Sequence, residues 1–209
     1  MTDGRSFTEY YTYWQQIFEF WVIGRLNLSN HEGIFSAGGL LVIGNVNESS
    51  VDSKVINAQY ESYYRGNRFN KYWAYQSSPA IEGVIYSIFD RLTSFSPNYN
   101  LKIFHLGVSI VNGLVFAVLV LWFYLEFGVF ASTLVLLFIS ISPWMILSGG
   151  NLYWQLWAFY VPLVAFLFYL RYDSCQMLHS ERRLVSWIFA FALIKILFTG
   201  FEFITRVLC

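Results

Sequence analysis

Charged residues are scarce in this sequence. Of its 209 residues only 12% are charged, and the formal net charge is zero. Soluble domains usually carry about 25% charged residues, so the composition excludes an ordinary soluble domain. A net charge of zero also argues against a nucleic-acid partner bound through an overall basic surface.

The motifs of soluble enzymes are absent as well. There is no phosphate-binding glycine loop, no nucleophile elbow and no cysteine and histidine spacing typical of zinc sites. His31 and Glu32 stand together in a predicted loop, but two ligands are too few to predict a metal centre. The sequence therefore predicts no cofactor and no metal site, although it is compatible with a divalent metal.

Long apolar segments are abundant. A bilayer core of about 30 Å needs roughly 20 apolar residues in a helix, and between Ile103 and Leu170 the only formal charge is Glu126. Four segments meet this requirement, which predicts an all-α, multi-pass transmembrane bundle over residues 101–209. The predicted spans are residues 103–124, 127–147, 153–170 and 184–204.

Basic residues in the short loops predict the orientation. The loop after the third span carries Arg171, Arg182 and Arg183, whereas the SGGN loop before that span carries no charge. Because positively charged loops stay in the cytoplasm, residues 1–100 are predicted to lie on the periplasmic or lumenal side. The same topology places Cys175 and Cys209 on opposite sides of the bilayer, so we expect no disulfide between them.

Two amphipathic helices are predicted in this outer domain, over residues 7–28 and 79–93. In both, apolar side chains recur at spacings of three and four residues. The first has a stripe of aromatic residues, which favours a helix lying in the membrane interface over a helix packed on a soluble core. The glycine- and asparagine-rich stretch that follows the first helix is predicted to be a loop.

An outer domain must be carried across the membrane, and residues 1–7 are polar without the apolar region of a signal peptide. We therefore expect a transmembrane helix before Met1 and interpret the chain as an internal fragment that is inactive alone. A complete four-span protein with a translocated tail is the alternative.

Polar residues inside the spans give two further candidates. Lys195, Thr199 and Glu202 share one face of the fourth span, which predicts either a functional site or a Lys–Glu pair that locks helices together. In the first span His105, Ser109 and Asn112 share a face, a pattern more typical of hydrogen bonding between helices than of a site.

The chain resembles the GT-C-type polytopic glycosyltransferases, which include protein mannosyltransferases and bacterial transferases that take sugars from polyprenyl phosphate. The resemblance rests on the long outer loop of amphipathic helices and on the stretches YQSSPAIEGVIYSIFDRL, SPWMILSGGNLYW and TGFEFITRV. It implies a multi-pass protein of the bacterial inner membrane. It further implies a polyprenyl-phosphate-linked sugar as donor, and a glycan, lipid or protein as acceptor.

In this family a catalytic acid lies in the first outer loop. The resemblance implies that Asp3 fills this role, with Glu9 close behind, as the base that deprotonates the acceptor hydroxyl. Cations should offset the charge of the leaving phosphate. The rival interpretation is a non-enzymatic membrane scaffold or transport subunit. The substrate-binding candidates are Arg5, Arg65, Arg68, Lys71, Lys195 and Glu202.

Overall fold

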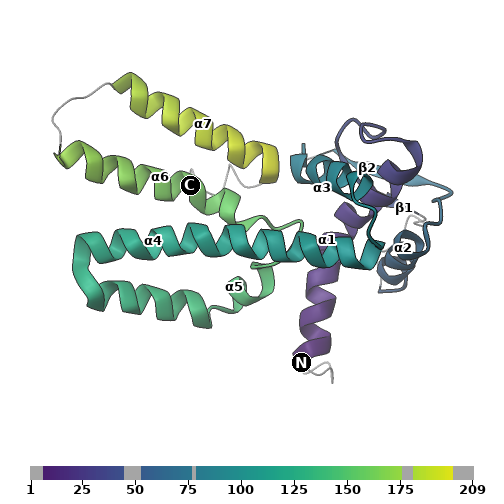
Figure 1. The fold of residues 1–209 in the computed structure, drawn as a ribbon, viewed down its shortest axis with the longest axis horizontal. Coiled ribbons are helices and arrows are strands. Elements are labelled where there is room, and N and C mark those ends of the chain that lie inside the picture. Colours follow the sequence, from purple (N-terminus) through teal and green to yellow (C-terminus); the bar gives the residue numbers. More distant parts are fainter. Residues whose placement is uncertain (1–6, 45–52, 77–78, 176–180, 200–209) are drawn as a thin grey trace.

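A computed structural model describes residues 7–44, 53–76, 79–175 and 181–199, and Figure 1 shows their arrangement. These residues form a mostly helical protein with a single two-stranded sheet, so the predicted helical class is confirmed. The elements are α1 (Phe7–Glu32), β1 (Leu41–Gly44), α2 (Ser53–Arg65), β2 (Tyr72–Tyr75), α3 (Ile81–Leu92), α4 (Pro97–Ile141), α5 (Pro143–Ser148), α6 (Leu156–Cys175) and α7 (Glu181–Thr199).

The second half of α1 forms the centre of a small N-terminal domain. Residues 22–29 are all buried, and α1 packs against α2, α3 and β1. A helix buried on every side belongs inside a core rather than on a lipid surface. This half of α1 therefore follows the alternative of a helix packed on a core. The stretch predicted as a loop contains the last turn of α1 and the whole of β1.

A short antiparallel hairpin covers one side of α1. Strands β1 and β2 pair from Leu41 opposite Tyr75 to Gly44 opposite Tyr72. The contact with α1 is very close at Gly24, where an added Cβ would overlap the carbonyl oxygen of Val42. The Gln59 amide donates to the Phe20 carbonyl and accepts a hydrogen bond from the Gly44 N–H at 2.9 Å. Gln59 thus joins α1, α2 and β1.

Helix α3 turns its polar face inward. Glu82 and Asp90 are buried, whereas Phe89 and Leu92 are 54% and 76% exposed. The sequence predicted an interfacial amphipathic helix here, with Glu82 and Asp90 opposite its apolar stripe, but it did not predict that these two acids are buried. The burial follows from the partners of Asp90 on neighbouring helices, and it leaves the apolar stripe facing outward, as a helix at a bilayer interface requires.

Asp90 connects four helices. Its Oδ1 accepts hydrogen bonds from the Tyr63 hydroxyl at 2.7 Å and from the Asn100 amide at 2.8 Å. Its Oδ2 accepts one from the Asn30 amide at 2.7 Å. These partners lie on α2, α4 and α1, so one carboxylate joins the N-terminal domain to the start of the long apolar helix.

Helix α4 is a helical hairpin. Gly128 has φ 82° and ψ −173°, a conformation that separates residues 97–127 from residues 129–141. Figure 1 shows the second arm returning alongside the first. The sequence predicted two separate spans that meet around Glu126, and the turn lies close to that position. Only glycine readily adopts this backbone region, which explains why the chain folds back here.

Among the described residues, α4 is the only helix that is long and apolar enough to cross a membrane, judged by length and composition. Shorter apolar stretches occupy Leu156–Arg171 and Val185–Thr199. The structure thus indicates membrane association, and the predicted four-span bundle is not confirmed.

The long helices extend away from the N-terminal domain (Figure 1). Helix α6 packs against α4, and α7 packs against α6. At the far end, Arg171 on α6 forms a 2.6 Å ion pair with Glu126 on α4. Large apolar side chains cover the outer surface of these helices. Examples of them are Leu106, Leu114, Phe130, Phe138 and Phe189, each of which is more than 60% exposed.

Candidate functional site

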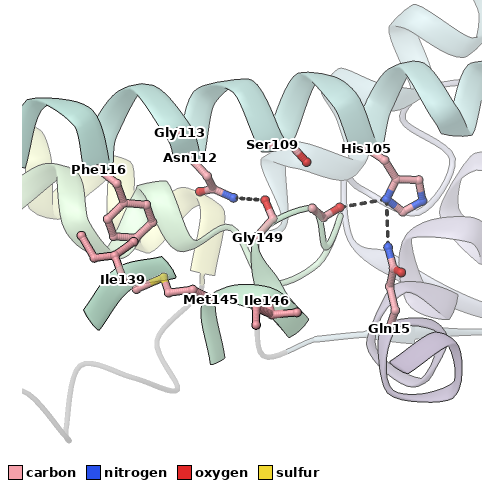
Figure 2. A pocket seen from close by; sticks show the side chains of 11 residues that line it. Gln15, His105, Ser109, Asn112, Gly113, Phe116, Ile139, Met145, Ile146 and Gly149 are labelled. Atoms are coloured by element: carbon pink, nitrogen blue, oxygen red, sulfur yellow. Dashed lines mark hydrogen bonds between the residues drawn. The ribbon is translucent and has the colours of Figure 1, made fainter. Parts of the chain in front are cut away.

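A cavity of about 460 Å³ lies where α1 meets the two arms of α4 and the short helix α5 (Figure 2). Its end near α1 is polar, with the side chains of Gln15, His105 and Ser109. Its other end is apolar, with Phe116 and Ile139 from the facing arms of α4. Asn112, Gly113, Met145, Ile146, Gly149 and Gly150 complete the lining. The cavity is therefore amphipathic along its length.

His105 lies at the polar end and contacts three groups through the same ring nitrogen. Its Nδ1 is 2.8 Å from the Gly150 carbonyl oxygen, 3.2 Å from the Gln15 amide nitrogen and 3.5 Å from Glu19 Oε1. We assign the Nδ1 proton to the shortest contact, in which it is donated to the Gly150 carbonyl. In that tautomer the other ring nitrogen, Nε2, carries the lone pair.

Glu19 is a buried carboxylate behind this histidine, with 1% of its surface exposed. It accepts hydrogen bonds from the Leu152 N–H at 2.9 Å and from the Tyr60 hydroxyl at 3.2 Å. Burial raises the pKa of Glu19, and the nearby His105 together with these hydrogen bonds partly opposes the rise. A protonated His105 would thus have a close carboxylate counter-charge.

The loop of residues 149–155 forms one wall of the cavity and rests on α1. Asn151 folds the loop by accepting hydrogen bonds from the N–H groups of Tyr153 at 3.0 Å and Trp154 at 2.8 Å. Its own amide donates to the Gln15 carbonyl at 3.2 Å. Together with the bond from Leu152 to Glu19, these contacts fix the loop to the same turn of α1 that reaches His105.

Asn112 joins α4 to this loop and to α6. Its amide nitrogen donates to the Gly149 carbonyl at 2.5 Å, a bond drawn in Figure 2. Its oxygen accepts a hydrogen bond at 2.6 Å from the backbone N–H of Trp157, in the first turn of α6. The face shared by His105, Ser109 and Asn112 was predicted to join helices, and Asn112 confirms this interpretation. The same face also lines the cavity.

The predicted catalytic and substrate-binding residues include three that are not described. Asp3, Arg5 and Glu202 lie outside the described residues. Glu9 lies on α1, but its side chain is not among those described. The catalytic assignment of Asp3 and Glu9 therefore stays a prediction.

Four predicted substrate-binding cations are described, and none of them lines the cavity. Arg65 forms an exposed ion pair with Glu61 at 2.9 Å. Arg68 pairs with Glu32 at 2.5 Å. Lys71 is exposed, and these three lie on or between α2 and β2. The structure thus places Arg65, Arg68 and Lys71 with the N-terminal domain, away from the cavity wall.

Lys195 is the fourth of these cations, and it lies on α7. Its ammonium is 5.6 Å from the centre of the Phe159 ring, so its described contact is a cation–π interaction with α6. This contact joins α7 to α6. The predicted pairing of Lys195 with Glu202 stays a prediction, because Glu202 lies outside the described residues.

The pair formed by His31 and Glu32 has no features of a metal site. The Glu32 carboxylate is engaged by Arg68 and by the Tyr72 hydroxyl, and both contacts lower its pKa, the bond from Tyr72 most. No group of three or more potential metal ligands occurs within the part of the chain that the structure describes.

Helical spacing over residues 7–28 predicts that Glu19 lies opposite the aromatic stripe, on the polar face of the helix. A signal for its burial is present in the sequence, because Glu19 and Arg25 interrupt a run that is otherwise apolar and aromatic. Buried charges need partners, and the partners of Glu19 lie far along the chain, at Tyr60 and Leu152. Sequence spacing could not reveal that pairing.

The chain has no significant match among protein-family models, curated proteins or solved structures.

Proposed function

We propose that this chain is part of a membrane-embedded glycosyltransferase. It moves a sugar from a polyprenyl-phosphate donor to a glycan, lipid or protein acceptor on the outer face of the membrane. The observation that carries the proposal is the amphipathic cavity between the N-terminal domain and the apolar helices. A polar end beside a buried Glu–His pair and an apolar end between helices suit a sugar phosphate attached to a hydrocarbon chain.

The proposed placement in the membrane uses four helical segments. The two arms of α4, with α6 and α7, cross the bilayer, and the Gly128 turn lies at the cytoplasmic side. Arg171, which pairs with Glu126 near that turn, supports this orientation because basic residues are enriched on the cytoplasmic side. Figure 1 shows α1 running across the direction of α4, which suits a helix lying parallel to the membrane surface.

The proposed chemistry uses His105 as the proton acceptor. The acceptor hydroxyl gives its proton to Nε2 of His105 while its oxygen forms a bond to the anomeric carbon. The bond between that carbon and the phosphate oxygen breaks, and polyprenyl phosphate leaves with the electron pair. Glu19 stabilises the imidazolium that results, from 3.5 Å. Asp3 and Glu9, the acids implied by the resemblance, remain candidates for the same step.

Transfer can be measured in membranes from cells that carry the gene with its flanking sequence. The substrate is a polyprenyl-phosphate-linked radiolabelled sugar, and the readout is label in a new product. We expect His105→Asn to lower transfer by at least about 100-fold, the usual range for losing a general base. Asparagine can still donate to the Gly150 carbonyl, so the loop position is retained.

Ser140→Ala is the control, because Ser140 is an exposed residue on the second arm of α4 that does not line the cavity. Its transfer should stay near that of the unaltered protein. If Asp3→Ala abolishes transfer while His105→Asn retains it, the base is Asp3 and the assignment of His105 is wrong. If the unaltered protein transfers no sugar from any such donor, the scaffold or transport interpretation replaces the proposal.

A further inference from the structure

A second cavity, of about 380 Å³, lies on the other side of α4. It is bounded by α3, α4, the start of α6 and the end of α7. Its walls are almost entirely apolar. Phe89 and Ile103, which line it, are also exposed at the surface, so the cavity is continuous with the apolar outer surface of the helices. The remaining apolar residues that line it are Ile85, Phe104, Gly107, Val108, Val111 and Phe198. We call this cavity the α3–α4 groove.

Glu82 gives the α3–α4 groove one ionisable group. Glu82 is one of the residues that line the groove, and it is 1% exposed. Neither carboxylate oxygen has a hydrogen-bond partner on any other described residue, and the polar group that acts on the carboxylate is the backbone N–H of Glu82 itself. Burial raises the pKa of Glu82 well above its usual value. A buried carboxyl group with both oxygens unpaired is unfavourable unless a partner is supplied.

The neighbouring polar groups of the groove already have partners. Gln155 donates to the Tyr86 hydroxyl at 2.8 Å and accepts the Trp157 indole N–H at 2.7 Å. Asn100 donates to Asp90 at 2.8 Å. Glu82 is therefore the group in the α3–α4 groove whose hydrogen-bonding capacity is left for a ligand.

We propose that the α3–α4 groove binds a hydrocarbon chain that carries a primary amine, with the ammonium group held by Glu82. The apolar walls and the volume suit a hydrocarbon chain. The ammonium supplies hydrogen-bond donors and a positive charge, so it can act as the partner that the buried carboxylate lacks. The amine can come from an aminolipid of the bilayer or from a free long-chain amine. This site is separate from the cavity of the proposed transfer reaction and does not depend on it.

The test uses bromine as a contact quencher of tryptophan fluorescence, because Trp157 lines the groove. The probes are the ω-bromododecyl amine, alcohol and acid, titrated into the purified chain in a non-ionic detergent. A charge-assisted hydrogen bond should make the amine bind about tenfold or more tightly than the alcohol, and the acid should bind least. Trp157→Phe should remove the part of the quenching that distinguishes the amine from the alcohol, which locates the probe in the groove.

Glu82→Gln is the decisive variant, because it keeps the shape of the side chain and removes the charge. It should bind the amine and the alcohol equally. The matched control is Glu61→Gln, which removes the same charge from an exposed position and should keep the tenfold preference. Equal binding of amine and alcohol by the unaltered chain, or an amine preference that survives Glu82→Gln, would overturn the proposal.

Nanodiscs distinguish the two sources of the amine. They contain brominated-chain phosphatidylethanolamine, which has a primary amine, or phosphatidylcholine, whose quaternary ammonium donates no hydrogen bond. Stronger quenching of Trp157 by the ethanolamine lipid identifies a bilayer aminolipid as the ligand. Equal quenching by the two lipids, with the amine preference kept in detergent, identifies a free amphiphile. Absence of quenching by every probe refutes the site.

Discussion

Replacement of Asp90 by alanine is expected to loosen the N-terminal domain from α4. Its carboxylate accepts three hydrogen bonds, from Tyr63, Asn100 and Asn30. Tyr63 and Asn100 are buried, so Asp90→Ala would leave both of their donors without a partner, whereas Asn30 is exposed and can bind water. Burial and the neighbouring Asp90 raise the pKa of Tyr63, which keeps its hydroxyl in the protonated form that donates to Asp90.

The magnitude follows from the two buried donors that would be left without an acceptor. A hydrogen bond to a charged group contributes about 1.5–3 kcal/mol, and Asp90→Ala removes two such bonds from buried donors. We therefore expect Asp90→Ala to lower the free energy of unfolding by about 3–5 kcal/mol. Asp90→Asn keeps one acceptor oxygen, so it should lose roughly half as much.

Denaturant unfolding of the purified chain, followed by tryptophan fluorescence, measures this change. A double-mutant cycle with Tyr63→Phe isolates the bond at 2.7 Å, and its coupling energy should be about 1.5–3 kcal/mol. A loss below about 1 kcal/mol for Asp90→Ala would contradict the reasoning. So would a coupling energy near zero, because it would mean that water satisfies Tyr63 equally well.

Three further predictions concern single residues. Protonated Glu82 favours the fold, so its contribution is fully present below its ordinary pKa of 4.5 and is lost as pH rises through the raised value. Glu82→Gln should therefore be more stable than the unaltered chain at pH 8 by about 1–3 kcal/mol and similar to it at pH 4, and a constant difference across pH would contradict this. Gly128→Ala should destabilise the hairpin by about 1–3 kcal/mol, because Gly128 has a positive φ. Gly107→Ala in the same helix is the control: its methyl group meets no atom within 4 Å, so thermal unfolding should show a neutral or slightly stabilising effect. Gly24→Ala should cost at least about 1–3 kcal/mol, since its methyl group overlaps the Val42 carbonyl, and an unchanged denaturation midpoint would show that β1 shifts away freely.

Local patterns predicted the positions of most helices. The segment 79–93 was predicted as a helix and corresponds to α3, and 153–170 and 184–204 overlap α6 and α7. Apolar runs of this kind are read directly from composition. Helix α2 and the two strands were not predicted, because four-residue strands are too short to show a period and their pairing joins residues far apart.

The candidate site depended on contacts that spacing does not encode. The face of His105, Ser109 and Asn112 was recognised from its helical period, and all three residues line the cavity. The burial of Glu19 and Glu82 was missed for one reason. Both stand on the polar side of an amphipathic pattern, and that pattern shows two faces without showing which face meets protein and which meets lipid.

The bond between the Leu152 N–H and Glu19 joins residues 133 positions apart. Contacts of such long sequence separation form late in folding, because a large loop must close first. In the proposed orientation the loop before α6 can reach its place only after α1 has been translocated and folded. Folding of the membrane-inserted half should then wait for export of the first hundred residues. A block in export would leave α6 inserted in the membrane without the contact between its preceding loop and α1.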